Sequence, residues 1–118
     1  MATITSHTLN SVDGTHAGGI AVTLTNRDTG NTLFSTHMDS SGRLQEKVSH
    51  AELNPDHRYE LTFYPAPYWA DQELEDTHCI DEIVLRFKMP DPDARYHMPI
   101  IISPNGYSTW ASVPESNG

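Results

Sequence analysis

The sequence predicts an all-β fold: an antiparallel β-sandwich of seven to eight short strands with one short helix. Three observations support this prediction. Apolar and polar residues alternate in short runs, turn-forming residues separate these runs at regular spacing, and 118 residues contain eight Pro and seven Gly. The length predicts one domain, 1–118, and its last residues, 114–118, are expected to form a loose tail.

The expected strands are runs with one apolar face. In the clearest of them, Ile20, Val22 and Leu24 alternate with small or polar residues, which is the period of a strand with one buried face. Pro65 ends a second strong run, because proline cannot continue a hydrogen-bonded ladder. The expected strands are 3–9, 20–25, 32–36, 44–48, 58–64 and 80–88, followed by two more within 96–109.

Turns and one helix connect these strands. Residues 28–31 predict a hairpin turn, and residues 39–43 predict the next turn. The helix is expected at 68–75, with Pro67 at its first turn, where a missing N–H costs little. Residues 96–109 place a histidine at the start of an apolar strand, then a Ser-Pro-Asn-Gly turn, then a last strand.

Charge and composition exclude several classes of partner. The formal net charge is −9 and only seven residues are Lys or Arg, which disfavours binding to nucleic acid or to an anionic membrane. No apolar run approaches the ~20 residues of a membrane span, and no signal peptide is visible at the N-terminus. The single cysteine, Cys79, cannot form an internal disulfide and is expected to be a half-buried small residue. A cytoplasmic protein is the expectation.

Common catalytic and metal motifs are absent from the sequence. The seven histidines show neither the His-x-His nor the His-x-x-x-His spacing of zinc sites, so no metal site is predicted. There is no Gly-x-Ser-x-Gly elbow and no Gly-rich phosphate loop. Asp81 and Glu82 are strand neighbours that point to opposite faces, so they cannot act as a paired acid and base.

Three blocks of sequence carry a resemblance to a known family. They are Ser6-His7-Thr8-Leu9-Asn10 with the small residues 17–19, Asp39-Ser40-Ser41-Gly42-Arg43, and the stretch 96–109. Together these blocks resemble the 5-hydroxyisourate hydrolases, which are the enzyme branch of the transthyretin fold. The similarity runs from about residue 4 to residue 109 and is thin between 66 and 81.

The resemblance implies a transthyretin-like β-sandwich that assembles as a homotetramer, a dimer of dimers. Active sites of this family lie in a channel at the dimer–dimer interface and use no metal or cofactor. The family opens a cyclic amide of 5-hydroxyisourate, an unstable product of urate oxidation. Its catalytic positions correspond to His7, Arg43 and His97 in this chain.

These residue types suit the implied reaction. An imidazole can deprotonate water near neutral pH, and a guanidinium can stabilise charge that develops on a carbonyl oxygen. The sequence does not assign the base, and we favour His97 for this role, with His7 as a positioning residue.

The C-terminal end departs from the family. Enzymes of the family end in Tyr-Arg-Gly-Ser directly after a Tyr-Ser-Thr like 107–109, whereas Trp110-Ala111-Ser112-Val113 follows here. Ala111 cannot replace a guanidinium, and Ser112 would face away from the site if the strand continued in regular alternation. The candidate substrate-binding residues are Tyr107, Ser108, Thr109, Trp110 and Ser112.

This departure leaves alternatives open. The first is a hydrolase of 5-hydroxyisourate or a similar small heterocycle. The second is a repurposed enzyme of the same fold that performs cyclisation, isomerisation or other carbonyl chemistry on a different small molecule. The third is a carrier of small ligands without catalytic activity.

Overall fold

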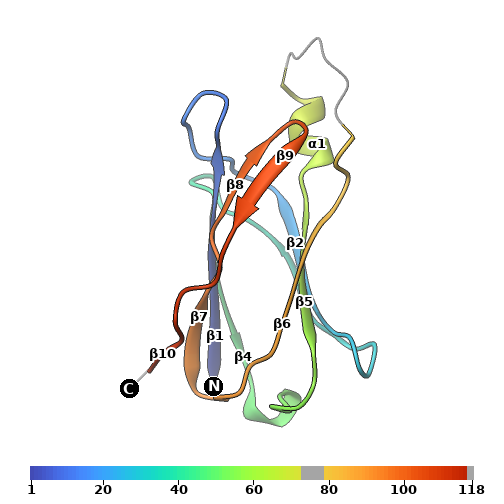
Figure 1. The fold of residues 1–118 in the computed structure, drawn as a ribbon, viewed down its shortest axis with the longest axis vertical. Helices are drawn as coiled ribbons and strands as arrows, with labels where there is room; N and C mark the ends of the chain where they lie inside the picture. The colour runs from blue at the N-terminus through green and yellow to red at the C-terminus, as the bar shows by residue number, and fades with distance from the viewer. Residues whose placement is uncertain (73–78, 117–118) are drawn as a thin grey trace.

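Two β-sheets lie face to face in the computed structural model, which describes residues 1–72 and 79–116 (Figure 1). The first sheet contains β1 (Ala2–Asn10), β4 (Arg43–Val48), β7 (Ala94–His97), β8 (Ile100–Ser103), β9 (Gly106–Thr109) and β10 (Glu115–Ser116). The second sheet contains β2 (Ala21–Asn26), β3 (Thr32–His37), β5 (Tyr59–Tyr64) and β6 (Ile83–Phe87), in the order β3-β2-β5-β6.

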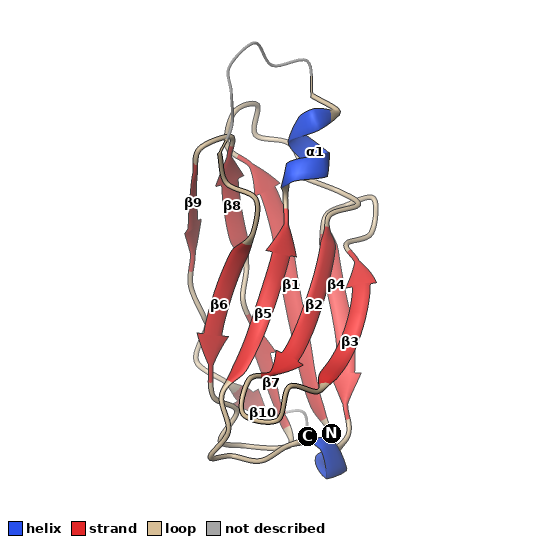
Figure 2. Ribbon diagram, turned by 90° about the vertical axis from the view of Figure 1, so that its right-hand side faces the viewer, coloured by secondary structure: helices blue, strands red, loops and turns tan. Residues whose placement is uncertain are grey.

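A short helix, α1 (Ala66–Ala70), follows β5 at one end of the sandwich, and a turn of 3-10 helix, η1 (His50–Glu52), lies at the other end (Figure 2). The β-sandwich expectation is confirmed, with ten strands in the described residues instead of seven to eight. None of the helices in the described part of the chain is long and apolar enough to span a membrane.

β1 is the centre of the first sheet and has three partners. Its first six residues pair with β4 in antiparallel register, while β7 and then β8 pair with its other edge. Both of these latter pairings are parallel, unlike the antiparallel arrangement expected from sequence. The first of the two strands expected within 96–109 is interrupted at Met98 and Pro99, because proline has no N–H to donate to a ladder. The Met98 amide still donates to the Thr5 carbonyl at 2.9 Å, so the segment stays beside β1.

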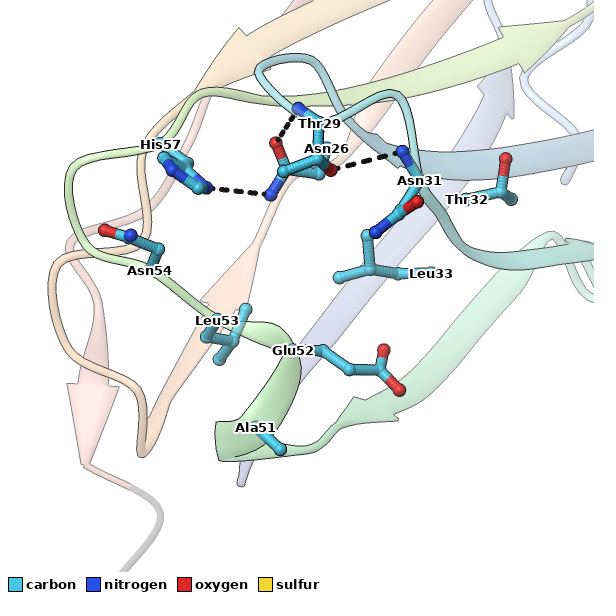
Figure 3. Close-up of a pocket in the computed structure, with 10 residues that line it drawn as sticks. All are labelled: Asn26, Thr29, Asn31, Thr32, Leu33, Ala51, Glu52, Leu53, Asn54 and His57. Carbon is cyan, nitrogen blue, oxygen red and sulfur yellow. Dashed lines mark hydrogen bonds between the residues drawn. The ribbon is translucent and has the colours of Figure 1, made fainter.

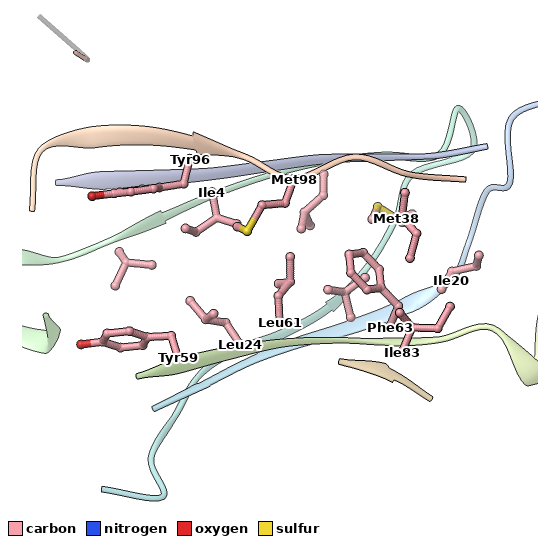
Figure 4. Close-up of a cluster of buried hydrophobic side chains, with 14 of the residues drawn as sticks. Ile4, Ile20, Leu24, Met38, Tyr59, Leu61, Phe63, Ile83, Tyr96 and Met98 are labelled. Atoms are coloured by element: carbon pink, nitrogen blue, oxygen red, sulfur yellow. The ribbon is translucent and has the colours of Figure 1, made fainter. Parts of the chain in front are cut away.

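Apolar side chains from both sheets meet in the core (Figure 4). Ile4, Tyr96 and Met98 from the first sheet face Leu61 and Phe63 from the second, and all five are buried. Since strand side chains alternate between faces, burial of residues 2 and 4 of β1 turns residues 3, 5 and 7 to the outer face. The core therefore decides which residues the first sheet presents on its outside.

Three local expectations differ from the structure. The helix begins at Ala66 and ends at Ala70, earlier than the predicted 68–75, of which residues 73–75 lie outside the described part. Cys79 is exposed, not half-buried. Within the expected loose tail, β10 pairs with β7, while 117–118 lie outside the described residues.

Candidate active site

Side chains from three adjacent strands form rows across the outer face of the first sheet. β1 lies between β4 and β7, and the register of the pairing defines the rows. The rows are Lys47–Thr3–Arg95, Gln45–Thr5–His97 and Arg43–His7. Opposite residues of an antiparallel pair have Cβ atoms about 5 Å apart. The three residues expected to be catalytic therefore come together on one face, although they lie far apart in the sequence.

His97 ends β7 and is held by β1. Its Nδ1 lies 2.8 Å from the Oγ1 of Thr5, a residue that is only 8% exposed. The hydroxyl fixes the ring orientation and leaves Nε2 without a hydrogen-bond partner among the described residues. An imidazole with one nitrogen held and the other available is suited to accept a proton from water.

Arg43 is positioned by the turn that precedes β4. The Asp39 carboxylate accepts hydrogen bonds from the amides of Ser41 and Arg43, both at 2.9 Å, and Gly42 has a φ of 73°. Glycine adopts this left-handed conformation without steric cost. The turn expected at 39–43 is thus present, and it delivers the guanidinium directly opposite His7. Arg43 forms no ion pair with a described residue, so it can serve an anionic ligand.

His7 lies on β1, and its pKa is lowered from 6.5. Partial burial is the largest cause, followed by the positive charge of Arg43 and then by His16 and His97. A hydrogen bond with the Ser41 backbone opposes the shift. The shift favours the neutral form of His7, in which an imidazole can accept as well as donate.

Two clefts meet at His97. One, of about 350 Å³, contains Thr5, Arg43 and His97, and the other, of about 270 Å³, contains Thr5, His97 and Ser112. Arg95 lines both. The clefts are open to solvent in the single chain, and a small planar molecule lying against His97 would contact both.

Ser112 reaches the site because the strand does not continue. β9 ends at Thr109, and the Ser112 amide donates to the His97 carbonyl at 3.0 Å. The alternation that would have turned Ser112 away therefore does not apply, and its side chain lines the cleft beside His97.

The other four substrate-binding candidates are divided by register. Ser108 pairs with Ile101, which pairs with Leu9, so Ser108 lies on the outer face that carries His7. Tyr107 and Thr109 flank it and project from the opposite face.

Thr109 is used structurally, since its hydroxyl donates to the Pro99 carbonyl at 2.8 Å. Trp110 is 48% exposed and lines neither cleft beside His97. Tyr107, Thr109 and Trp110 do not line the two clefts at His97 in the single chain, and their role in substrate binding stays a prediction.

Sequence reasoning missed three residues of this face: Thr5, Arg95 and His16. Thr5 and Arg95 each lie two positions before a predicted catalytic histidine in the same strand, so the period of two could have placed them on the same face. His16 had no such signal, because a loop brings it to His7.

A larger cleft, of about 620 Å³, lies away from these residues, between the β2–β3 turn and the segment from η1 to β5 (Figure 3). Its ionisable side chains are Glu52 and His57. The Asn26 amide, which Figure 3 shows beside His57, bonds that ring at 3.1 Å and also accepts from the amides of Asp28 and Thr29. These bonds support the turn, and no guanidinium or second imidazole lines this cleft. Of the residues predicted to be catalytic, His97 and Arg43 line the smaller clefts, whereas His7 lines neither of them.

Comparison with known proteins agrees with the resemblance seen in the sequence. The HIUase/transthyretin family, where HIUase denotes 5-hydroxyisourate hydrolase, matches residues 4–111. The chain is 31% identical over 111 residues to 5-hydroxyisourate hydrolase 2 of Rhizobium meliloti (strain 1021), covering 91% of this chain and 92% of that protein.

Solved structures give the same result. The 5-hydroxyisourate hydrolase of Klebsiella pneumoniae has a TM-score of 0.78 and 28% identity, with 96% of this chain and 100% of that chain covered. Sea bream transthyretin in complex with thyroxine has a TM-score of 0.79 and 23% identity, covers 93% of this chain and 94% of its own, and supports the fold alone. The family prediction is confirmed: this chain belongs to the HIUase/transthyretin family.

Proposed function

We propose that this chain is a 5-hydroxyisourate hydrolase of purine catabolism. The observation that carries the proposal is the pairing register, which sets Arg43, His7 and His97 on three adjacent strands of one sheet face. Relatives named as 5-hydroxyisourate hydrolases, which match over most of the chain, support the same activity.

The proposed reaction opens a cyclic amide by hydrolysis. His97 accepts a proton from water through Nε2, because Thr5 already holds Nδ1. The water oxygen then bonds to the amide carbon, and the negative charge that develops on the carbonyl oxygen is stabilised by Arg43. The carbon–nitrogen bond breaks, and the proton carried by the histidine passes to the leaving nitrogen.

The remaining residues of the face hold the substrate in this scheme. His7 lies beside Arg43 and orients the ring that is attacked, Ser112 offers a hydroxyl group in the cleft beside His97, and Ser108 offers another on the same sheet face. An orienting role needs short, fixed contacts, because misplacement of the reacting atoms by about 1 Å can cost 10²-fold in rate.

The direct test uses freshly generated 5-hydroxyisourate, whose spontaneous decay changes its ultraviolet absorbance. We expect purified protein to accelerate this decay in proportion to its concentration. An unaltered decay at all protein concentrations would remove the proposed function.

Arg43 gives a second test. Arg43→Ala should lower kcat on the order of 10²- to 10³-fold, the usual effect of removing one group that stabilises a developing oxyanion. Arg43→Lys should recover part of the loss, since it keeps the charge but not the planar pair of donors. Equal activity of both variants and the wild type would show that Arg43 takes no part.

A cytoplasmic homotetramer, a dimer of dimers, is part of the proposal. Arg43 and Arg95 are exposed in the single chain, and a guanidinium stabilises charge weakly when water surrounds it. A second copy that covers the face would exclude this water and enclose the two clefts. Light scattering should then give four times the 13.2 kDa mass of one chain, whereas a 13.2 kDa particle at assay concentration would contradict the assembly.

A repurposed enzyme acting on another anionic heterocycle is the second candidate. Two observations favour it. Arg95 and Ser112 line a cleft, and residue 111 of this chain is alanine, where the hydrolases carry arginine. Binding of urate-like anions without accelerated decay of 5-hydroxyisourate would favour this candidate, or a carrier if no turnover of any bound anion follows.

A further inference from the structure

His16 reaches His7 from the loop that follows β1. Its Nδ1 lies 2.8 Å from the Nε2 of His7, and the two ring centroids are 4.9 Å apart with an interplanar angle of 32°. The proposed hydrolysis does not use His16, and its side chain is exposed.

Backbone hydrogen bonds hold His16 in this position. Leu9 and His16 form an isolated β-bridge, the Asn10 amide donates to the Thr15 carbonyl at 2.8 Å, and the Ala17 amide donates to the Thr8 carbonyl at 3.0 Å. Hydrogen bonds thus join the residues on both sides of His16 to the strand that carries His7. The fold of this loop therefore holds the two rings together.

A hydrogen bond between two imidazole nitrogens requires one proton between them. If both nitrogens carried protons they would repel each other, and if neither did there would be no donor. The pair therefore couples the tautomer of His7 to that of His16, because one of the two nitrogens must donate and the other must accept.

Other groups around His7 disfavour a positive charge on its ring. Arg43 faces it from β4 and His97 from β7, and both disfavour a second positive charge at this place. The nearest carboxylate in the turn before β4 belongs to Asp39, whose Oδ1 is already occupied by two backbone amides.

We propose that His16 is a positioning residue for His7: its imidazole holds the His7 ring in place and, through the hydrogen bond between the two nitrogens, restricts its tautomer. This inference rests on the proposed function, because His7 contacts a substrate only if this face is the active site. It assigns the His7–His16 pair to orientation, and leaves His97 to activate water.

The test compares His16→Ala with His16→Asn. Alanine removes the contact, whereas asparagine keeps a polar atom close to the position of Nδ1. His37→Ala is the matched control, because His37 is an exposed histidine on a strand of the other sheet. Nitrogen-15 NMR of the histidine rings reports the tautomer and pKa of His7 without substrate, and kcat and KM are measured against pH.

In the wild type, NMR should show one tautomer of His7 and a pKa below 6.5. In His16→Ala the pKa of His7 should rise toward 6.5, because a neighbouring imidazole and part of the burial are lost, and a second tautomer should become detectable beside the one that the Ser41 backbone favours. The acid limb of the pH profile should move upward with it, and kcat should fall roughly tenfold with a smaller change in KM. His16→Asn should restore the single tautomer and part of kcat, and His37→Ala should match the wild type.

The inference is wrong if His16→Ala keeps the wild-type tautomer, pKa and pH profile, and in that case the proposed function still stands. It is also wrong if His37→Ala loses as much kcat as His16→Ala, because the loss would then not depend on the contact. If His16→Ala fails to fold, His16→Asn is used alone. Mixed tautomers of His7 in that variant, together with a wild-type pH profile, would show that the tautomer does not matter for activity and would overturn the role. A wild-type chain without hydrolytic activity removes both the proposed function and this role.

Discussion

His97→Ala is expected to lower kcat/KM on the order of 10²- to 10⁴-fold, the range of a positioned general base. Nδ1 of His97 is held by Thr5 at 2.8 Å, and the ring lies where the two clefts of this face meet. Removing the ring takes away the group that accepts the proton of water but leaves the backbone of β7 unchanged. Initial rates of 5-hydroxyisourate disappearance, corrected for spontaneous decay, measure the effect.

Thr5→Val is the matched companion to His97→Ala. It removes the hydroxyl that orients the imidazole and keeps a β-branched side chain of similar size in the strand. We expect an intermediate loss that falls mainly on kcat. If His97→Ala retained wild-type kcat/KM while remaining folded, His97 would not be the base.

Gly42→Ala is expected to destabilise the chain on the order of 2 to 5 kcal/mol. Gly42 has a φ of 73°, and an added Cβ would lie 2.6 Å from the Thr8 carbonyl oxygen. The backbone must shift to relieve this contact. That shift is opposed by the hydrogen bond that the Thr8 amide donates to the Gly42 carbonyl at 2.7 Å. Because this shift moves the start of β4 away from β1, Arg43 should also lose its place beside His7, and activity should fall.

Gly30→Ala separates the two causes of this loss. Gly30 has a φ of 81°, but an added Cβ would have no neighbour within 4 Å, so only the left-handed backbone cost of about 1–2 kcal/mol applies. Denaturant midpoints at one protein concentration compare the two variants. Equal destabilisation by both substitutions would contradict the clash at Gly42.

Local patterns predicted most of the fold. Alternation of Ile20, Val22 and Leu24 identified one strand, and the prolines after residue 64 correctly ended another. These signals work because successive side chains of a strand point to opposite faces, so the alternation of apolar and polar residues shows which face is buried. The two parallel pairings of β1 were missed, since they join residues about ninety positions apart and leave no local signal.

The candidate site was predicted in part for the same reason. The resemblance supplied His7, Arg43 and His97, and the register of β1 with β4 and β7 explains why these three residues share a face. The placement of Ser112 depended on where β9 ends, and the contact of His16 depended on a loop. Both are decided by tertiary structure, which a period of two cannot describe.

The central claim is that side chains from β1, β4 and β7 act as one site. A double-mutant cycle on kcat/KM with Arg43→Ala and His97→Ala tests it most directly, because these residues lie on opposite sides of β1. Groups that act as a unit are strongly non-additive, so the double variant should lose little more activity than the worse single variant. Losses in activation free energy that add to within about 0.3–0.5 kcal/mol would contradict the claim, because independent sites behave in that way.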